Sequence, residues 1–156
     1  MENLINYFYD SLKQDTIYEH IGEYIKVSTP FLDVHNDCIE FYMKCNANDT
    51  IYITDDGYVL NNLDSRGLNF NISPLKKVLK NILSFYNVNI DFKENNSLTI
   101  TTQYKNFPYK VQSYIQCILA LNNFYFLVKN FDTTISESLS ENVNLGNNNE
   151  EFKSPF

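Results

Sequence analysis

Hydrophobic residues recur along the chain at two spacings, and each spacing predicts one kind of element. Helical spacing near the N-terminus predicts an amphipathic helix over residues 2–13 that covers one face of a sheet. A second helix is predicted to begin at Ser73-Pro74, with Ser73 as its N-cap and the proline at its first position. A third is predicted from Pro108 to about Lys129, and because it is apolar nearly all round we expect it to be the most buried.

Alternation of apolar and polar residues predicts the strands. They are expected at residues 23–28, 38–44, 51–53, 88–92 and 98–102. Loops rich in Asn and Asp at 46–49 and 93–96 would join four of these strands into two hairpins. Pro30 is expected to end the first strand, because proline cannot donate to a ladder. A short helix is predicted over Tyr58–Leu63, with a break at Arg66-Gly67.

Together these elements predict an α+β fold. We expect a mixed or antiparallel sheet of about five strands, packed by an N-terminal helix, a middle helix and a buried C-terminal helix. Residues 1–130 would form a single domain. Residues 131–156 are rich in Ser, Glu and Asn and would form a polar C-terminal tail, since that composition cannot bury enough apolar surface to fold alone.

The charge balance narrows the class of partner. With 12 basic and 19 acidic side chains, the formal charge is -7, which disfavours direct nucleic-acid binding and favours a protein partner with a basic surface. The sequence contains no apolar run long enough for a membrane span and no signal-peptide pattern. Cys38, Cys45 and Cys117 match neither a disulfide framework nor a zinc motif, so we expect a cytoplasmic protein.

Acidic residues concentrate in two segments that the predicted hairpin would bring together. The candidate acidic site consists of Asp33, His35, Asp37, Asp55 and Asp56. Clustered carboxylates repel one another unless a cation, a proton or backbone donors compensate, and oxygen ligands suit Mg²⁺ or Mn²⁺. The metal hypothesis therefore takes Asp33, Asp37 and Asp55 as ligands.

Three further residues are candidates for supporting this site. They are Asn36 in the first acidic segment, Lys44 on the neighbouring strand and Asn122 on the last helix. The amide of Asn122 would hydrogen-bond the acidic loop from behind, or face solvent at a helix edge. A second explanation of the acidic segments stays open, because Asp and Asn also stabilise turns by accepting hydrogen bonds from nearby backbone N–H groups.

The predicted element order resembles the core of restriction-endonuclease-like nucleases. Those enzymes carry an acidic residue and a lysine one position apart on the third strand, to hold a metal for phosphodiester cleavage. Here the corresponding stretch is Thr54-Asp-Asp-Gly57, which has no lysine, and Lys44 is the nearest substitute. The missing lysine counts against a nuclease.

Two stretches, Thr29-Pro-Phe-Leu-Asp-Val-His-Asn-Asp37 and Ile53-Thr-Asp-Asp-Gly-Tyr58, carry a resemblance to an uncharacterised domain family of bacteria and phages. The resemblance extends over roughly Ile21 to Val128 and includes Asn122-Asn123. It implies a setting in bacteria and mobile elements and supplies no reaction.

The sequence leaves two hypotheses about function. The first is a small acidic binding module that engages a protein, such as a host defence or nucleic-acid-handling protein, as an inhibitor or nucleic-acid mimic. The alternative is a metal-dependent phosphodiesterase or nuclease, with Asp33, Asp37, Asp55 and Asp56 as ligands and His35 as ligand or general base.

Overall fold

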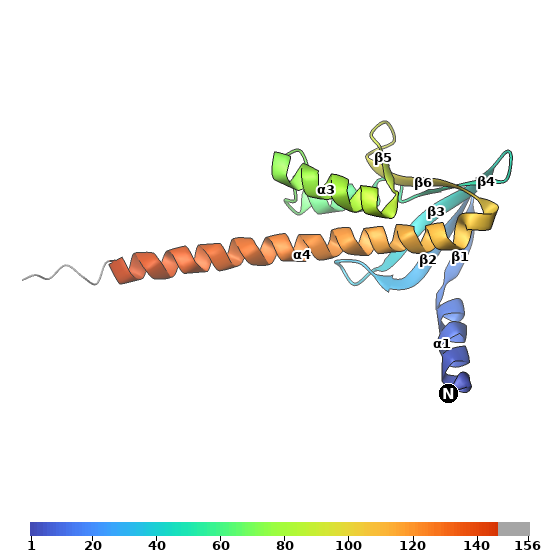
Figure 1. The fold of residues 1–156 in the computed structure, drawn as a ribbon, viewed down its shortest axis with the longest axis horizontal. Helices are drawn as coiled ribbons and strands as arrows, with labels where there is room; N and C mark the ends of the chain where they lie inside the picture. The colour runs from blue at the N-terminus through green and yellow to red at the C-terminus, as the bar shows by residue number, and fades with distance from the viewer. Residues whose placement is uncertain (147–156) are drawn as a thin grey trace, which may run out of the picture. The chain divides into compact units, whose positions relative to one another are not determined.

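The computed structural model describes residues 1–146 of the chain and shows an α+β fold (Figure 1). Within those residues six strands form one antiparallel sheet, in the order β1-β2-β3-β4-β6-β5. The strands are β1 (Ile17–Ile21), β2 (Tyr24–Leu32), β3 (Cys38–Asn46), β4 (Thr50–Thr54), β5 (Asn89–Asp91) and β6 (Ser97–Gln103). The helices are α1 (Glu2–Asp15), α2 (Tyr58–Ser65), α3 (Ser73–Tyr86) and α4 (Phe107–Gly146), with a 3-10 turn at Tyr104–Asn106. The predicted fold class is confirmed.

One face of the sheet carries the hydrophobic core. Ile53 and Leu98 on the central strands are fully buried, and the ring of Phe41 meets that of Tyr114 edge-on, with 6.1 Å between their centroids. Tyr114 lies in the first turns of α4, which run along this face (Figure 1). The beginning of α4 is thus the buried helix that its apolar sequence predicts.

The first strand, β1, was not predicted. It pairs only with β2, along the edge of the sheet, and all its residues are exposed. Thr16 is the single residue between α1 and β1, and Gly22, at φ +59, makes the turn into β2. A strand exposed on both faces does not need alternating apolar residues, which is why the periodicity gave no signal.

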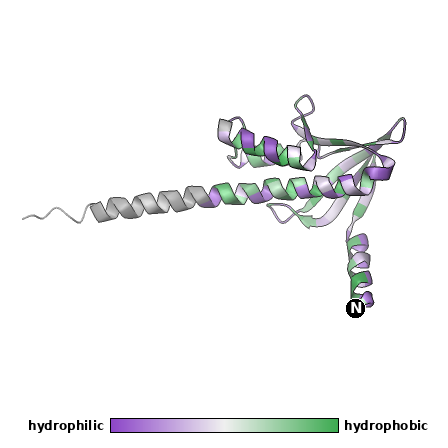
Figure 2. Ribbon diagram, viewed as in Figure 1, coloured by the Kyte–Doolittle hydropathy of each residue, from purple (hydrophilic) through white to green (hydrophobic). Residues whose placement is uncertain are grey.

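Helix α1 forms where the sequence predicts it, but it does not cover a face of the sheet. None of its residues, all of which the structure describes, is buried. Leu4, Ile5 and Phe8 are 71%, 54% and 58% exposed, and Figure 2 shows hydrophobic positions along this helix. The buried face that they were expected to contact is covered by the beginning of α4.

Pro30 does not end β2, which continues to Leu32. The register between β2 and β3 changes between Ser28 and Leu32, so Pro30 lies in an irregular stretch where no ladder N–H is needed. The hydroxyl of Thr29 donates to the Ile39 carbonyl at 2.9 Å and so makes a cross-strand bond inside this irregularity. The irregularity leads directly into the first acidic segment.

The helices α3 and α4 differ from prediction at their ends. The N-cap of α3 is Ile72, whose backbone is extended, so Ser73 is the first helical residue and Pro74 the second. The last helix was predicted to end near Lys129 but continues to Gly146, into the segment predicted as a polar tail. The rest of that tail, residues 147–156, lies outside the described residues.

The chain divides into two units, Met1–Asn123 and Phe124–Phe156. The first contains the sheet, α1 to α3 and the beginning of α4, and the second continues α4. Among residues 1–146, no helix is both long and apolar enough to cross a membrane. All candidate site residues lie in the first unit.

Candidate functional site

The loop between β2 and β3 is held by Asp33. One carboxylate oxygen of Asp33, Oδ1, accepts the backbone N–H of His35 at 2.7 Å and of Asp37 at 3.1 Å. The Asp33 N–H in turn donates to the Asp37 carbonyl at 2.8 Å, which closes the loop. Asn36 takes the left-handed conformation (φ 63) that Asn tolerates better than most residues. Asp33 and Asn36 thus serve the turn, as the second explanation of this segment expected.

Helix α2 lies against this loop through side chains spaced four residues apart. The Tyr58 hydroxyl donates to Oδ2 of Asp33 at 3.1 Å, and Asn62 Oδ1 contacts Nε2 of His35 at 2.9 Å. Arg66 contacts the other ring nitrogen of His35, Nδ1, and its Nε donates to Asn62 Oδ1 at 3.2 Å. Burial, followed by the nearby charge of Asp33, raises the pKa of Tyr58.

These contacts indicate which ring nitrogen of His35 accepts a hydrogen bond. A guanidinium donates hydrogen bonds and cannot accept them, so Nδ1 of His35 is the acceptor from Arg66. The ring proton then lies on Nε2, which donates to Asn62. Both ring nitrogens of His35 are engaged within the chain, an arrangement that positions the loop and leaves no nitrogen oriented as a general base.

Asp55 connects β4, α2 and β6. It is only 2% exposed, and its carboxylate accepts three backbone N–H groups, from Gly57 at 3.1 Å, Val59 at 2.8 Å and Leu98 at 2.7 Å. Burial raises the pKa of Asp55, although these three hydrogen bonds oppose that shift. Asp55 therefore supplies the acceptor for the first turn of α2 and fixes that helix to the sheet.

The loop and α2 form the two sides of an open groove of about 1080 Å³, which we call the loop–α2 groove. It is lined by His35, Asp37, Glu40, Asp56, Tyr58, Asn62 and Arg66, with Asp55 beneath. Asp37 and Asp56 are exposed, and neither carboxylate forms a hydrogen bond or an ion pair with the residues that the structure describes. The two acidic segments thus meet at one groove.

The structure does not gather these carboxylates around one point. Among the residues whose side chains the structure describes, 1–130 except Ser73, no group of three or more His, Cys, Asp or Glu side chains is arranged to hold a metal ion. Asp33 and Asp55, two of the three predicted ligands, direct their carboxylates at backbone N–H groups, and the third, Asp37, is exposed. The donor set therefore does not fit the predicted Mg²⁺ or Mn²⁺ site.

Lys44 does not support the acidic segments. Its ammonium lies 4.8 Å from the ring centroid of Tyr24 and 5.8 Å from that of Tyr52, which is its partner on β4. A hydrogen bond with Tyr24, followed by the nearby charges, raises the pKa of Lys44. It cannot replace the lysine that the nuclease pattern requires, because that lysine must reach the carboxylates.

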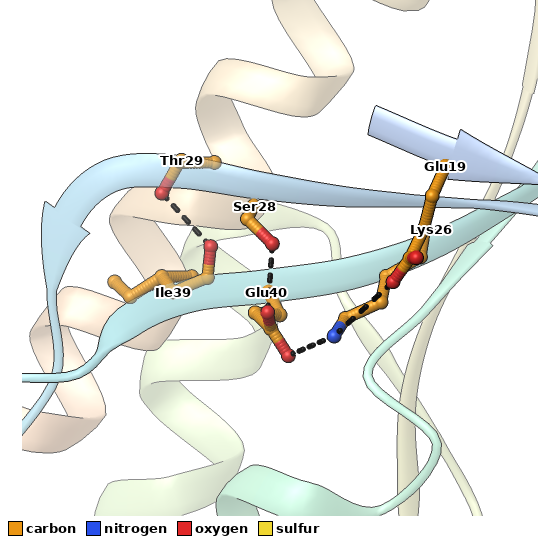
Figure 3. Close-up of polar contacts among 6 residues, drawn as sticks. All are labelled: Glu19, Lys26, Ser28, Thr29, Ile39 and Glu40. Atoms are coloured by element: carbon orange, nitrogen blue, oxygen red, sulfur yellow. Dashed lines mark hydrogen bonds and ion pairs between the residues drawn. The ribbon is translucent and has the colours of Figure 1, made fainter. Parts of the chain in front are cut away.

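Glu40 shares the exterior face of the sheet with Lys44 but already has partners. Lys26 forms ion pairs with Glu40 at 2.9 Å and Glu19 at 3.7 Å, and the Ser28 hydroxyl donates to Glu40 at 2.7 Å (Figure 3). Burial alone would raise the pKa of Glu40, but the hydrogen bonds from Ser28 and Lys26 outweigh it and lower the pKa. The groove carboxylates available to a partner are thus Asp37 and Asp56.

Asn122 is buried beside Asp33, but its amide N–H groups do not form the predicted hydrogen bond to the loop. The residue is 6% exposed and lines a small cavity of about 10 Å³ together with Asp33 and Tyr58. Its Nδ2 has no hydrogen-bond partner among the described residues. An unpaired buried amide costs free energy, so this position is poorly optimised for stability.

Helix α2 carries a polar stripe that was not among the predicted site residues. Tyr58, Asn62 and Arg66 recur every four residues, the spacing that places side chains on one helix face. The four-residue spacing is a signal in the sequence, but the helix predicted over Tyr58–Leu63 ends before Arg66, which falls in the predicted break. The structure makes Arg66 the C-cap of α2.

Fold and site together define a small α+β domain in which one helix and one acidic loop frame an open groove. The model of the family described as "Domain of unknown function DUF1828" matches residues 29–121, so the chain belongs to this family. The match begins within β2 and ends within α4, and it includes the loop, α2 and α3 but neither α1 nor β1. No curated protein and no solved structure matches the chain.

Proposed function

We propose that the chain is an acidic binding module whose loop–α2 groove receives a basic segment of a protein partner. The observation that supports this function best is that the carboxylates have two different roles. Asp33 and Asp55 hold the loop and α2 through backbone hydrogen bonds, whereas Asp37 and Asp56 are exposed in the groove. Two carboxylates on rigid supports bind a cation with little further loss of conformational entropy.

The chemistry of the groove favours arginine or lysine side chains as the partner groups. A guanidinium can form two parallel hydrogen bonds with a carboxylate, and an ammonium can form one. The net charge of -7 adds long-range attraction to a basic surface and repels a phosphate backbone. The hydroxyl oxygen of Tyr58, whose proton is donated to Asp33, can still accept a hydrogen bond in the same groove.

This chemistry also suits a more specific role in a phage or mobile-element setting. A host defence or nucleic-acid-handling protein has a basic groove, and an acidic protein that occupies that groove acts as a nucleic-acid mimic and inhibitor. The site of action would then be the bacterial cytoplasm. This role rests on the charge and the family setting, whereas the groove geometry supports only the binding of a basic partner.

The groove can be tested with a fluorescently labelled arginine-rich peptide as probe. We expect the double variant Asp37→Asn/Asp56→Asn to lose most of the peptide binding that the wild type shows by fluorescence anisotropy at low salt. The matched control is Glu23→Gln/Asp49→Asn, which removes the same charge from two exposed residues outside the groove. Binding should also fall steeply toward about 1 M salt, where the screening length is about 3 Å.

Equal loss of binding in the two double variants would show that only net charge matters and would overturn the proposal. The geometry does not favour the alternative of a metal-dependent nuclease, because the predicted ligands are engaged elsewhere or dispersed. That alternative requires heat on titration with Mn²⁺ and cleavage of labelled DNA or RNA. If wild type showed Mn²⁺ binding or nucleic-acid cleavage and Asp37→Asn did not, the nuclease alternative would be supported again.

A further inference from the structure

A second concave surface lies on the other side of α2, away from the loop–α2 groove. It is formed by α2, α3 and β5, has a volume of about 510 Å³, and is called the α3 groove here. Its apolar lining includes Leu60, Phe70, Leu79, Leu83, Ile90 and Phe92. Leu60, Leu79 and Leu83 are buried at its base, whereas Phe92 is 75% exposed and is the most accessible apolar side chain of this surface.

Charged residues of both signs line the α3 groove, with the positive sign in excess. Lys76 and Lys80 on α3 lie along it, and Asp64 on α2 is the acidic residue among those lining it. An occupant is therefore expected to be apolar and weakly acidic. This groove does not serve the proposed function, because it favours a partner of the opposite charge.

Helix α1 is both apolar on one side and weakly acidic, as the occupant of the α3 groove is expected to be. Leu4, Ile5 and Phe8 form an exposed apolar stripe, and the charged residues of this helix are Glu2, Asp10 and Asp15 against a single Lys13. At 100° per residue, Asp15 falls on the same side as the stripe and Lys13 does not. An isolated helix of this length is only marginally stable in water, so its apolar stripe needs a surface to contact.

The C-terminal end of α1, where Asp15 lies, cannot reach the α3 groove of its own chain. Only Thr16 separates α1 from β1, which is one edge of the sheet, whereas β5 beside the α3 groove is the opposite edge. Five intervals of about 4.8 Å between six strands place these edges about 24 Å apart. An α1 that places Asp15 in this groove must therefore belong to another copy.

We propose that α1 of one copy of this chain docks into the α3 groove of a second copy, with its apolar stripe against Phe92 and Asp15 toward Lys76 and Lys80. The acidic helix does not suit a membrane surface, because anionic lipids repel it. The helix and the groove are complementary in both hydrophobicity and charge. This contact is a helix-in-groove interaction between identical chains.

The test exploits the fact that helix and groove can be disabled separately. Phe8→Asp disables the helix and Phe92→Asp the groove, and both side chains are exposed, so the core is not disturbed. Phe85→Asp is the control, since Phe85 is 78% exposed, lies on α3 and does not line the groove. Sedimentation equilibrium from about 1 to about 100 μM covers micromolar affinities. Circular dichroism verifies that each variant is folded.

We expect the wild type and Phe85→Asp to self-associate and each of the other two variants to be monomeric. An equimolar mixture of Phe8→Asp and Phe92→Asp should form a dimer, because the intact helix of one meets the intact groove of the other. A monomeric wild type, unchanged association of either variant, or a mixture that stays monomeric would overturn the proposal. Association that survives both substitutions would instead indicate pairing through the β1 edge.

Discussion

Replacement of Asp55 by asparagine tests whether this residue is a structural connector. Its carboxylate accepts N–H groups of Gly57, Val59 and Leu98, whereas an asparagine offers one acceptor oxygen and an NH₂ donor. In either orientation of the amide, at least one of these N–H groups loses its acceptor. A buried unsatisfied donor costs about 1–3 kcal/mol, so we expect a loss of about 2 kcal/mol and a Tm lower by about 4–8 °C.

Urea unfolding followed by circular dichroism measures this loss as a lower midpoint at an unchanged m-value. The control is Asp56→Asn, because Asp56 is exposed and its left-handed backbone (φ 55) accepts Asn, and it should change stability by less than about 0.5 kcal/mol. Equal effects of the two substitutions would refute the reasoning. They would show that the three hydrogen bonds contribute no more than a surface charge does.

The difference in stability between wild type and Asp55→Asn depends on pH, and the raised pKa of Asp55 determines the sign of that dependence. Burial raises the pKa of Asp55 above its ordinary 3.8, so the folded chain binds this proton more tightly than the unfolded chain. The stabilisation linked to this proton is fully present below the unfolded pKa and is lost as the pH rises through the folded pKa. The stability difference between wild type and Asp55→Asn should therefore shrink as the pH rises from about 3.8, and then remain constant.

Other substitutions give further predictions. Gly57→Ala should cost at least about 2 kcal/mol in urea unfolding, because the left-handed φ of +79 strains any side chain and the new Cβ would overlap the Asn95 carbonyl oxygen. Asn122→Leu should stabilise the fold by about 1 kcal/mol, since it removes an unpaired buried amide, and a destabilised variant would show that this amide has a partner. Tyr58→Phe should lower stability by less than about 1 kcal/mol but accelerate amide exchange in residues 33–37, which lose the bond from Tyr58 to Asp33.

The helices with strong apolar periodicity were predictable, and the exposed elements were not. The stripe of α3 and the apolar start of α4 reflect burial, which is what periodicity measures. The edge strand β1 buries nothing and left no pattern. The stripe on α1 correctly predicted a helix, but it could not reveal that the helix is uncovered within its own chain.

The same limit applies to the candidate site. Its two acidic segments could be predicted to meet, because strand pairing through the Asn46 loop determines which ends of β3 and β4 are adjacent. Whether each carboxylate points outward or at the backbone depends on turn geometry that composition does not encode. Asp33 and Asp37 lie in one short loop, yet the first accepts its backbone N–H groups and the second is exposed.

Cys117 provides an internal reporter of how often the core opens. Its side chain is fully buried, and burial, followed by the nearby charge of Asp55, raises the pKa of this thiol to about 12. Cys38 and Cys45 are exposed and free, so an alkylating reagent should modify them in the native protein. Mass spectrometry can measure the slower rate of alkylation at Cys117. That rate would report how often α4 separates from the sheet.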